Sequence, residues 1–96
     1  MDLSKHLLSK RKMLLGSRLR VLRQESGLTR EEIAKTYGFS ARSIRTWEVG
    51  ERDIKAIMLV EYLKVFELYG IKISLDALFD FEEELVTIAK KTIIIK

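Results

Sequence analysis

Apolar side chains recur at helical spacing through the first third of the chain. Four of them form a stripe between arginines: Leu15, Leu19, Val21 and Leu22. Residues three and four apart share one face of a helix, so this stripe predicts an amphipathic helix from about Leu14 to Ser26, which Gly27 ends. The preceding basic segment, residues 1–13, is also amphipathic and forms either a separate helix or an N-terminal extension of this one.

A second amphipathic helix is predicted to begin at Thr29. Thr29 is a favourable N-cap residue, and Glu32 lies three residues later, which is the spacing of a capping box that satisfies free amides at a helix start. Gly38 lies just past the apolar face of this helix, where a backbone with positive φ can close it. We therefore expect a short helix between Thr29 and Gly38.

A third helix is predicted directly afterwards, over residues 41–48. Ser40 offers an N-cap, and the eight residues that follow contain no Gly or Pro, which favours a helix. Ile44 and Trp47 lie one turn apart and point to one side of it. The opposite side displays a largely polar surface formed by Ala41, Arg42, Arg45 and Thr46.

Arginine on an exposed helix face can recognise DNA. The major groove admits one α-helix, and the planar guanidinium fork matches the two acceptors of a guanine edge. The alternative is a solvated basic face with no partner. Because Arg42 and Arg45 lie opposite the apolar pair Ile44 and Trp47, the spacing favours the DNA-reading surface.

The next elements are also predicted to be helical. Dense apolar positions predict a core helix over residues 54–69, which Gly70 ends. Ser74 caps a further helix. The residues of that helix expected to face inward are Leu75, Leu78 and Phe79. Since the chain has no Pro and only five Gly residues, we expect helices separated by short turns and an all-α fold class.

The C-terminal extension, residues 82–96, has two competing interpretations. Its β-branched residues predict a strand, whereas a helix to about Lys91 is the alternative. A lone strand cannot satisfy its own backbone groups, so an extended Ile93–Ile95 would pair with a second copy of the chain. This extension is therefore a candidate dimerisation segment.

Length and charge predict one domain with a polyanionic partner. Ninety-six residues with 47% hydrophobic and 33% charged content are typical of a single globular unit. Residues 1–50 carry 11 Lys and Arg against 5 Asp and Glu, a net charge of +6, whereas residues 51–96 carry 7 against 9, a net charge of −2. This asymmetry indicates that the first half contacts a polyanion. DNA is the favoured partner, and a membrane surface contacted by residues 1–13 is the rival.

Several other functional classes are disfavoured. The longest apolar run, Ala56–Val60, is far shorter than the ~18 residues that a membrane helix needs. The chain has no secretory signal pattern and no cysteine, so we expect a cytoplasmic location and no membrane partner. One histidine, His6, and no Ser or Asp paired with a base leave no candidate catalytic residue. We therefore do not expect an enzyme. The acidic residues Asp80 and Glu82–Glu84 lack the ligand spacing of a calcium loop, so we expect no metal site. We expect no cofactor either.

The residues from about Gly16 to Phe79 resemble the lambda-repressor-like helix-turn-helix domains of the Cro and phage-repressor (XRE) type. The positions that carry the resemblance are Gly16, Arg18, Leu19, Leu22 and Arg23 in the first helix, Leu28, Thr29, Glu32, Ile33 and Ala34 in the second, and Gly38, Ser40, Ile44, Trp47, Glu48, Gly50 and Arg52 thereafter. The resemblance implies a five-helix bundle whose third helix enters the major groove, and dimers that span two half-sites ~34 Å apart.

The resemblance also implies roles for single residues. The residues that would read base edges are Ala41, Arg42, Ser43, Arg45 and Thr46. Those that would bind DNA phosphates are Arg30, Ser40 and Arg52. The structural residues would be Thr29, Trp47 and an internal ion pair of Arg23 with Glu48. The family often has Gln at the position of Ala41, where it would read adenine, but alanine offers only a methyl contact to thymine.

These observations predict a sequence-specific DNA-binding transcriptional regulator, a repressor that binds double-stranded DNA as a homodimer. The expected fold is an all-α, five-helix lambda-repressor-like bundle over residues 14–81, with an N-terminal helical extension and a C-terminal helix or strand. The alternative function is a protein-interaction module on the same fold, such as an antitoxin that binds a toxin or an adaptor that binds another regulator.

Overall fold

The computed structural model describes residues 3–81, and every regular element in that range is a helix. The elements are, in chain order, α1 (Leu3–Glu25), α2 (Arg30–Tyr37), α3 (Ala41–Glu48), α4 (Ala56–Glu67) and α5 (Leu75–Leu78). The predicted all-α class with five helices is confirmed for this part of the chain. The helix or strand predicted within residues 82–96, and the dimer contact predicted there, lie outside the described residues.

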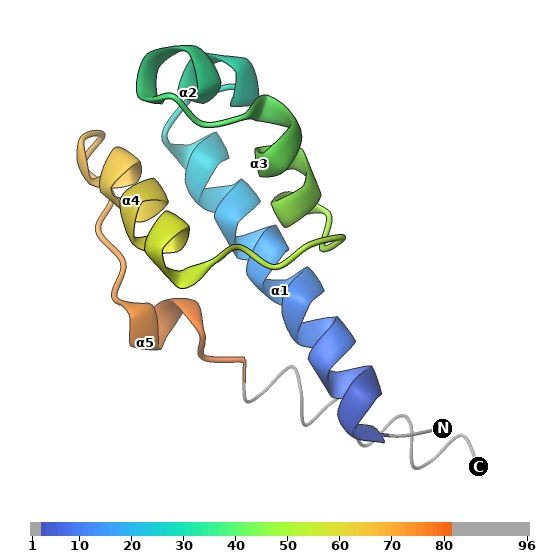
Figure 1. The fold of residues 1–96 in the computed structure, drawn as a ribbon. Coiled ribbons are helices and arrows are strands. Elements are labelled where there is room, and N and C mark those ends of the chain that lie inside the picture. The colour runs from blue at the N-terminus through green and yellow to red at the C-terminus, as the bar shows by residue number, and fades with distance from the viewer. Residues whose placement is uncertain (1–2, 82–96) are drawn as a thin grey trace.

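The first helix is longer than the apolar stripe alone predicts. α1 runs without interruption through 23 residues, so the basic segment before Leu14 is an extension of the first helix and not a separate one. No proline breaks this stretch, and leucine, lysine and arginine are favourable helix residues. The N-terminal half of α1 projects beyond the other helices (Figure 1).

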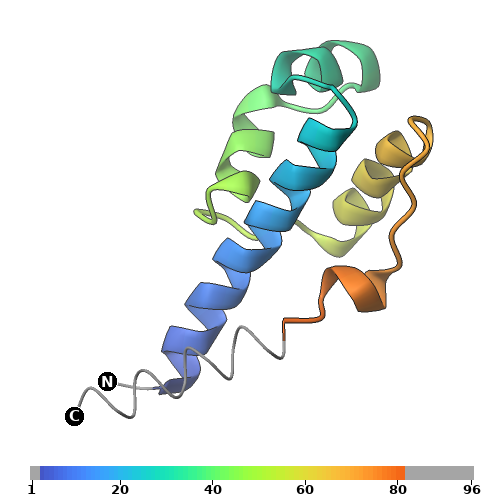
Figure 2. The ribbon, with the colours of Figure 1, turned by 180° about the vertical axis from the view of Figure 1, so that it is seen from behind.

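The core lies where the other helices meet the second half of α1. In both ribbon views α3 lies on one side of α1, and α4 and α5 lie on the other, while α2 crosses the end of the helix (Figure 1, Figure 2). Three leucines of the predicted stripe are buried: Leu15, Leu19 and Leu22. Val21, also expected in the stripe, is 50% exposed and lines an open groove with Ile73 and Ala77.

α1 and α3 approach each other closely at Gly16. A Cβ atom on Gly16 would lie 2.3 Å from the carbonyl oxygen of Trp47 and 2.6 Å from that of Glu48. Real side chains never come so near to backbone oxygens, so only glycine permits this crossing. Gly16 therefore fixes how α3 sits on α1.

Local sequence signals set the boundaries of α2 and α3. The Thr29 hydroxyl accepts a hydrogen bond from the Glu32 amide at 3.0 Å, and the Glu32 carboxylate accepts one from the Thr29 amide at 3.1 Å. The predicted capping box is therefore present. Gly38 ends α2 with φ 78°, and the Ser40 hydroxyl accepts a hydrogen bond from the Ser43 amide at 3.2 Å at the start of α3.

Removing the cap of α2 is expected to destabilise the domain modestly. Thr29→Ala loses the hydroxyl acceptor for the Glu32 amide, so we expect the free energy of unfolding to fall by about 1 kcal/mol. Thr36→Ala is the matched control, because Thr36 is exposed on the same helix and lies far from its start. Equal thermal melts for the two variants would mean that the capping box does not stabilise α2.

α4 and α5 differ from their predicted forms at the ends. α4 starts two residues later than predicted, and Ile54 is buried from the preceding loop. The buried face of α4 consists of Leu59, Tyr62, Leu63, Val65 and Phe66. In α5, Ser74 forms the expected N-cap, but only Leu78 is fully buried. The prediction that Leu75 and Phe79 face inward is wrong: each is 47% exposed, because a helix of four residues turns only one position toward the core.

Arg18 joins α1 to the end of α5. Its Nη1 donates hydrogen bonds to the carbonyls of Ala77 (2.8 Å) and Leu78 (3.0 Å), and its Nη2 donates one to the carbonyl of Asp80 (2.6 Å). The guanidinium also lies 4.4 Å from the centre of the Phe81 ring. One side chain of α1 thus binds the backbone carbonyls at and just after the C-terminus of α5.

Candidate nucleic-acid interface

α3 presents two arginines on its outer face. Arg42 and Arg45 are exposed, and the Arg45 side chain retains 55% of its accessible surface. Ala41 and Ser43, at the start of the helix, are half-buried. α3 is therefore a short helix with guanidinium groups on the side that faces solvent.

The inner face of α3 is anchored by Trp47, as the sequence predicts. Ile44 is fully buried, and Trp47 is 8% exposed. The indole packs edge-on against Phe39 and Tyr62, with ring centroids 6.4 and 5.6 Å away. The Tyr62 hydroxyl is buried without a hydrogen-bond partner among residues 3–81, and this burial raises the pKa of the hydroxyl. The indole therefore holds α3 in place and is not available to stack on a base.

The expected exposure of Thr46 is wrong. Thr46 is only 9% exposed, and its hydroxyl donates a hydrogen bond to the carbonyl of Ser43 at 2.8 Å. Its own carbonyl accepts hydrogen bonds from the amides of Glu51 (3.0 Å) and Arg52 (3.4 Å). The turn after α3 folds back over this side of the helix, which removes Thr46 from the face that Arg42 and Arg45 share.

The ion pair expected between Arg23 and Glu48 is present and buried. Nε of Arg23 lies 2.6 Å from Oε2 of Glu48, and Nη2 lies 3.0 Å from Oε1. Nη1 of Arg23 donates a further hydrogen bond to the carbonyl of Leu28 at 2.9 Å. The Glu48 side chain is fully inaccessible to solvent, and its hydrogen bond raises the pKa of Arg23. This pair ties the end of α3 to α1.

Arg30 joins the same carboxylate, which the sequence did not indicate. Its Nε and Nη2 lie 3.1 and 2.9 Å from Oε1 of Glu48, and its side chain is 28% exposed. Sequence reasoning assigned Arg30 to DNA phosphates alone. A signal for the internal contact was its place in the first turn of α2, where the helix dipole disfavours a cation unless an anion lies nearby. Two guanidinium groups now share one carboxylate, so the cluster of Arg23, Arg30 and Glu48 keeps a net positive charge.

The loop after α3 contributes one cation and one anion beside Arg45. Arg52 is exposed at the position predicted for a phosphate contact. Glu51 was not singled out by the sequence, yet its Oε1 lies 3.8 Å from Nη1 of Arg45, and both side chains are more than half exposed. The outer surface of α3 and the start of this loop therefore carries Arg42, Arg45 and Arg52 together with the Glu51 carboxylate.

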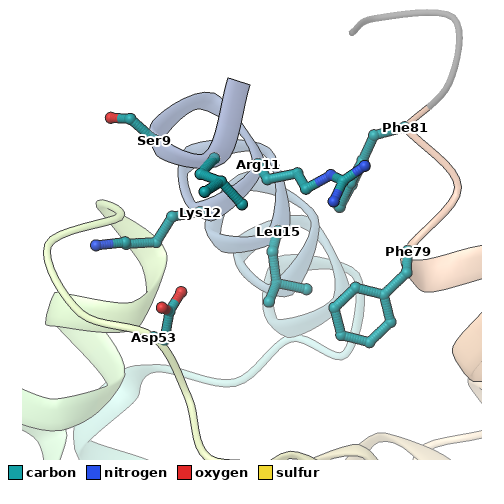
Figure 3. Close-up of a pocket in the computed structure, with 8 residues that line it drawn as sticks. Ser9, Arg11, Lys12, Leu15, Asp53, Phe79 and Phe81 are labelled. Carbon is teal, nitrogen blue, oxygen red and sulfur yellow. The ribbon is translucent and has the colours of Figure 1, made fainter. Parts of the chain in front are cut away.

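A separate cavity lies between the N-terminal half of α1 and the segment after α5. It has a volume of about 490 Å³, and Figure 3 shows side chains that line it. Its lining consists of Leu8, Ser9, Arg11, Lys12, Leu15, Asp53, Phe79 and Phe81. Figure 3 shows apolar side chains of α1 and the two phenylalanines on its walls, with Lys12 and Asp53 near one edge. Among the described residues that line this cavity, none is a histidine or a cysteine.

The described residues also bear on metal and membrane binding. Within residues 3–81, no three His, Cys, Asp or Glu side chains lie close enough together to hold a metal ion. In the same range, no helix has both the length and the apolar character needed to cross a membrane. The acidic residues 82–84 lie outside the described part.

Comparison with known proteins identifies a family to which the chain is similar. A family model described as a helix-turn-helix domain matches residues 14–70. The matched range begins within α1 and contains all of α2, α3 and α4, so it includes every residue of the candidate interface. Neither the curated proteins nor the solved structures give a match.

Proposed function

Because the chain belongs to a helix-turn-helix domain family of the lambda-repressor-like type, we propose that it is a sequence-specific transcriptional regulator that inserts α3 into the major groove of double-stranded DNA. DNA binding is what a helix-turn-helix domain implies. The observation that carries the proposal is the exposed pair Arg42 and Arg45 on a helix whose other face is fixed by Trp47. An arginine on such a face can donate two hydrogen bonds to O6 and N7 of guanine.

The base-reading surface that we propose is smaller than the sequence suggested. Arg42 and Arg45 would read bases, and Ala41 and Ser43 would contact base edges or adjacent phosphates near the start of α3. Thr46 is not included, because it is buried and its hydroxyl donates to the carbonyl of Ser43 within α3.

Phosphate contacts would come from residues on both sides of α3. Arg52 is exposed in the loop after the helix, and Ser40 is exposed at its start. Arg30 would add a contact only through the part of its side chain that Glu48 leaves accessible. Such contacts release counterions and make the affinity depend on salt.

We also propose that the protein acts as a homodimeric repressor in the cytoplasm, with residues 14–81 as its DNA-binding domain. Homodimers of this geometry span two half-sites about one helical turn, ~34 Å, apart. Selection of bound sites from random DNA tests specificity and symmetry together. Two inverted half-sites at that spacing would support the homodimer, and a single half-site would contradict it.

Arginine substitutions test the division of roles. Arg45→Ala and Arg42→Ala are each expected to cost ~1–3 kcal/mol on the selected site and to relax the preference at one base position. Arg52→Ala should weaken binding to all sequences alike and lower the salt slope by ~1. Lys64→Ala is the control, because Lys64 is an exposed cation on α4. Binding can be followed by fluorescence anisotropy, and equal losses on every sequence for the α3 variants would contradict the assignment.

A protein partner is the second candidate function. Large apolar side chains are exposed on α4 and at its C-cap, among them Ile57 (74% exposed) and Leu68 (72% exposed). A groove of about 450 Å³ between α2 and α4 is lined in part by Tyr37, Phe39 and Met58. Exposed apolar surface of this kind is common at protein–protein contacts. A stable complex with a co-purifying toxin or regulator, without affinity for DNA, would favour this function over the first.

A further inference from the structure

One carboxylate lies on the surface that the proposed function turns toward DNA. Oε1 of Glu51 is 3.8 Å from Nη1 of Arg45, and the two side chains retain 57% and 55% of their accessible surface. An anion beside a base-reading arginine opposes the approach of DNA phosphates. Overall affinity for DNA therefore does not explain why a glutamate lies at this position.

Stability does not supply that reason. Ion pairs between exposed side chains contribute little to folding, because water and salt screen them and both side chains lose freedom. The chain contains a second pair of the same kind on α4, where Oε1 of Glu61 lies 3.3 Å from Nζ of Lys64 and the glutamate is also 57% exposed. Glu51 and Glu61 thus have the same charge and the same accessible fraction, but only Glu51 lies beside α3.

The backbone holds Glu51 in place. The amides of Glu51 and Arg52 both donate to the carbonyl of Thr46. The amide of Gly50 donates to the carbonyl of Trp47 at 3.2 Å, and Gly50 has φ 79°, a left-handed conformation that glycine adopts readily. This turn is therefore part of the end of α3, and it keeps the Glu51 carboxylate near Arg45.

The two kinds of DNA contact affect Arg45 differently. A guanidinium has five N–H donors, and a bidentate contact with guanine uses two of them, which leaves donors for Glu51. A phosphate contact instead brings a second anion toward the carboxylate, and like charges repel. Glu51 therefore penalises a phosphate contact of Arg45 more than it penalises a guanine contact.

We propose that Glu51 is a specificity-determining residue, which opposes the use of Arg45 as an indiscriminate phosphate ligand and leaves its contact with a guanine edge less affected. This inference rests on the proposed function, because it concerns how α3 discriminates between DNA sequences. Specificity is a difference between two affinities, and a repulsive element that weakens the wrong complex raises it.

The test compares Glu51→Gln with Glu61→Gln in the full chain. Each variant is titrated with the site selected by the wild-type protein and with a scrambled duplex, at several salt concentrations. Glu51→Gln is expected to bind the scrambled duplex more tightly, with a salt slope steeper by ~1, since Arg45 gains a phosphate contact. The ratio of the two affinities should fall about tenfold, within the range of one base contact. Glu61→Gln should leave this ratio unchanged.

The outcomes separate the two proposals. If the wild-type protein enriches no sequence from random DNA, the proposed function fails and the inference fails with it. If the wild-type protein discriminates but the two glutamine variants keep equal affinity ratios, only the inference about Glu51 is overturned. Thermal melts of both variants should match that of the wild type, which would show that any change in the ratio does not come from unfolding.

Discussion

Gly16→Ala is expected to lower the free energy of unfolding by about 2–3 kcal/mol. The added Cβ would lie 2.3 Å from the carbonyl oxygen of Trp47, so α3 must move away from α1 or the helix must distort. Inserting a methyl group into a packed contact typically costs about 1–3 kcal/mol, and a backbone oxygen yields less than a flexible side chain. In a domain of this size the loss corresponds to a fall of roughly 10–20 °C in Tm.

Intrinsic helix preference makes the opposite prediction for the same substitution. Alanine inside a helix is about 1 kcal/mol more favourable than glycine, so an unpacked Gly16 would gain stability on replacement. Ser17→Ala is the control, because Ser17 is exposed on the same turn of α1. A Gly16→Ala protein that melts at or above the wild-type temperature would show that the close crossing of α1 and α3 does not exist.

Glu48→Gln is expected to cost about 3 kcal/mol of stability, as a neutral side chain of the same shape. Glu48 is fully buried and is the common partner of Arg23 and Arg30, whose guanidinium nitrogens approach its oxygens to 2.6–3.1 Å. Losing the charged partner of a buried pair typically costs about 3–5 kcal/mol, because the remaining charge is left uncompensated. In Glu48→Gln both Arg23 and Arg30 would lose their negatively charged partner at the junction of α1, α2 and α3. Chemical denaturation measures the change directly.

Two comparison variants identify the cause of that loss. Glu61→Gln removes the same charge from an exposed pair and is expected to change stability by less than about 1 kcal/mol. Arg30→Met leaves the pair of Arg23 with Glu48 in place, so it should cost less than Glu48→Gln. If Glu48→Gln unfolds at the same denaturant concentration as Glu61→Gln, the buried cluster contributes nothing beyond surface charge.

Features set by neighbouring residues could be predicted from the sequence. The capping box of Thr29 and Glu32 depends on two residues three positions apart, and the end of α2 depends on Gly38 alone. The inward position of Trp47 follows from helical spacing. Each of these features depends on residues within about one helical turn, so the local pattern was sufficient to predict them.

Features set by distant residues could not be predicted in the same way. Whether the basic segment before Leu14 extends the first helix or forms a separate one was left open, because its amphipathic pattern fits both. The reason for a glycine at position 16 is the close approach of α3, which lies far away in the sequence. Helical spacing placed Thr46 outside, but the hydrogen bonds of the next turn cover it. The contact between Arg30 and Glu48 joins residues 18 positions apart, and the spacing of a single helix carries no information about it.

The hydrogen bonds of Arg18 constrain the order in which the domain assembles. They connect α1 to carbonyls 59 to 62 residues later in the chain. A helix of four residues such as α5 is too short to persist by itself in water. During synthesis Arg18 leaves the ribosome before these carbonyls do, so we expect α5 to form only once it can pack on α1.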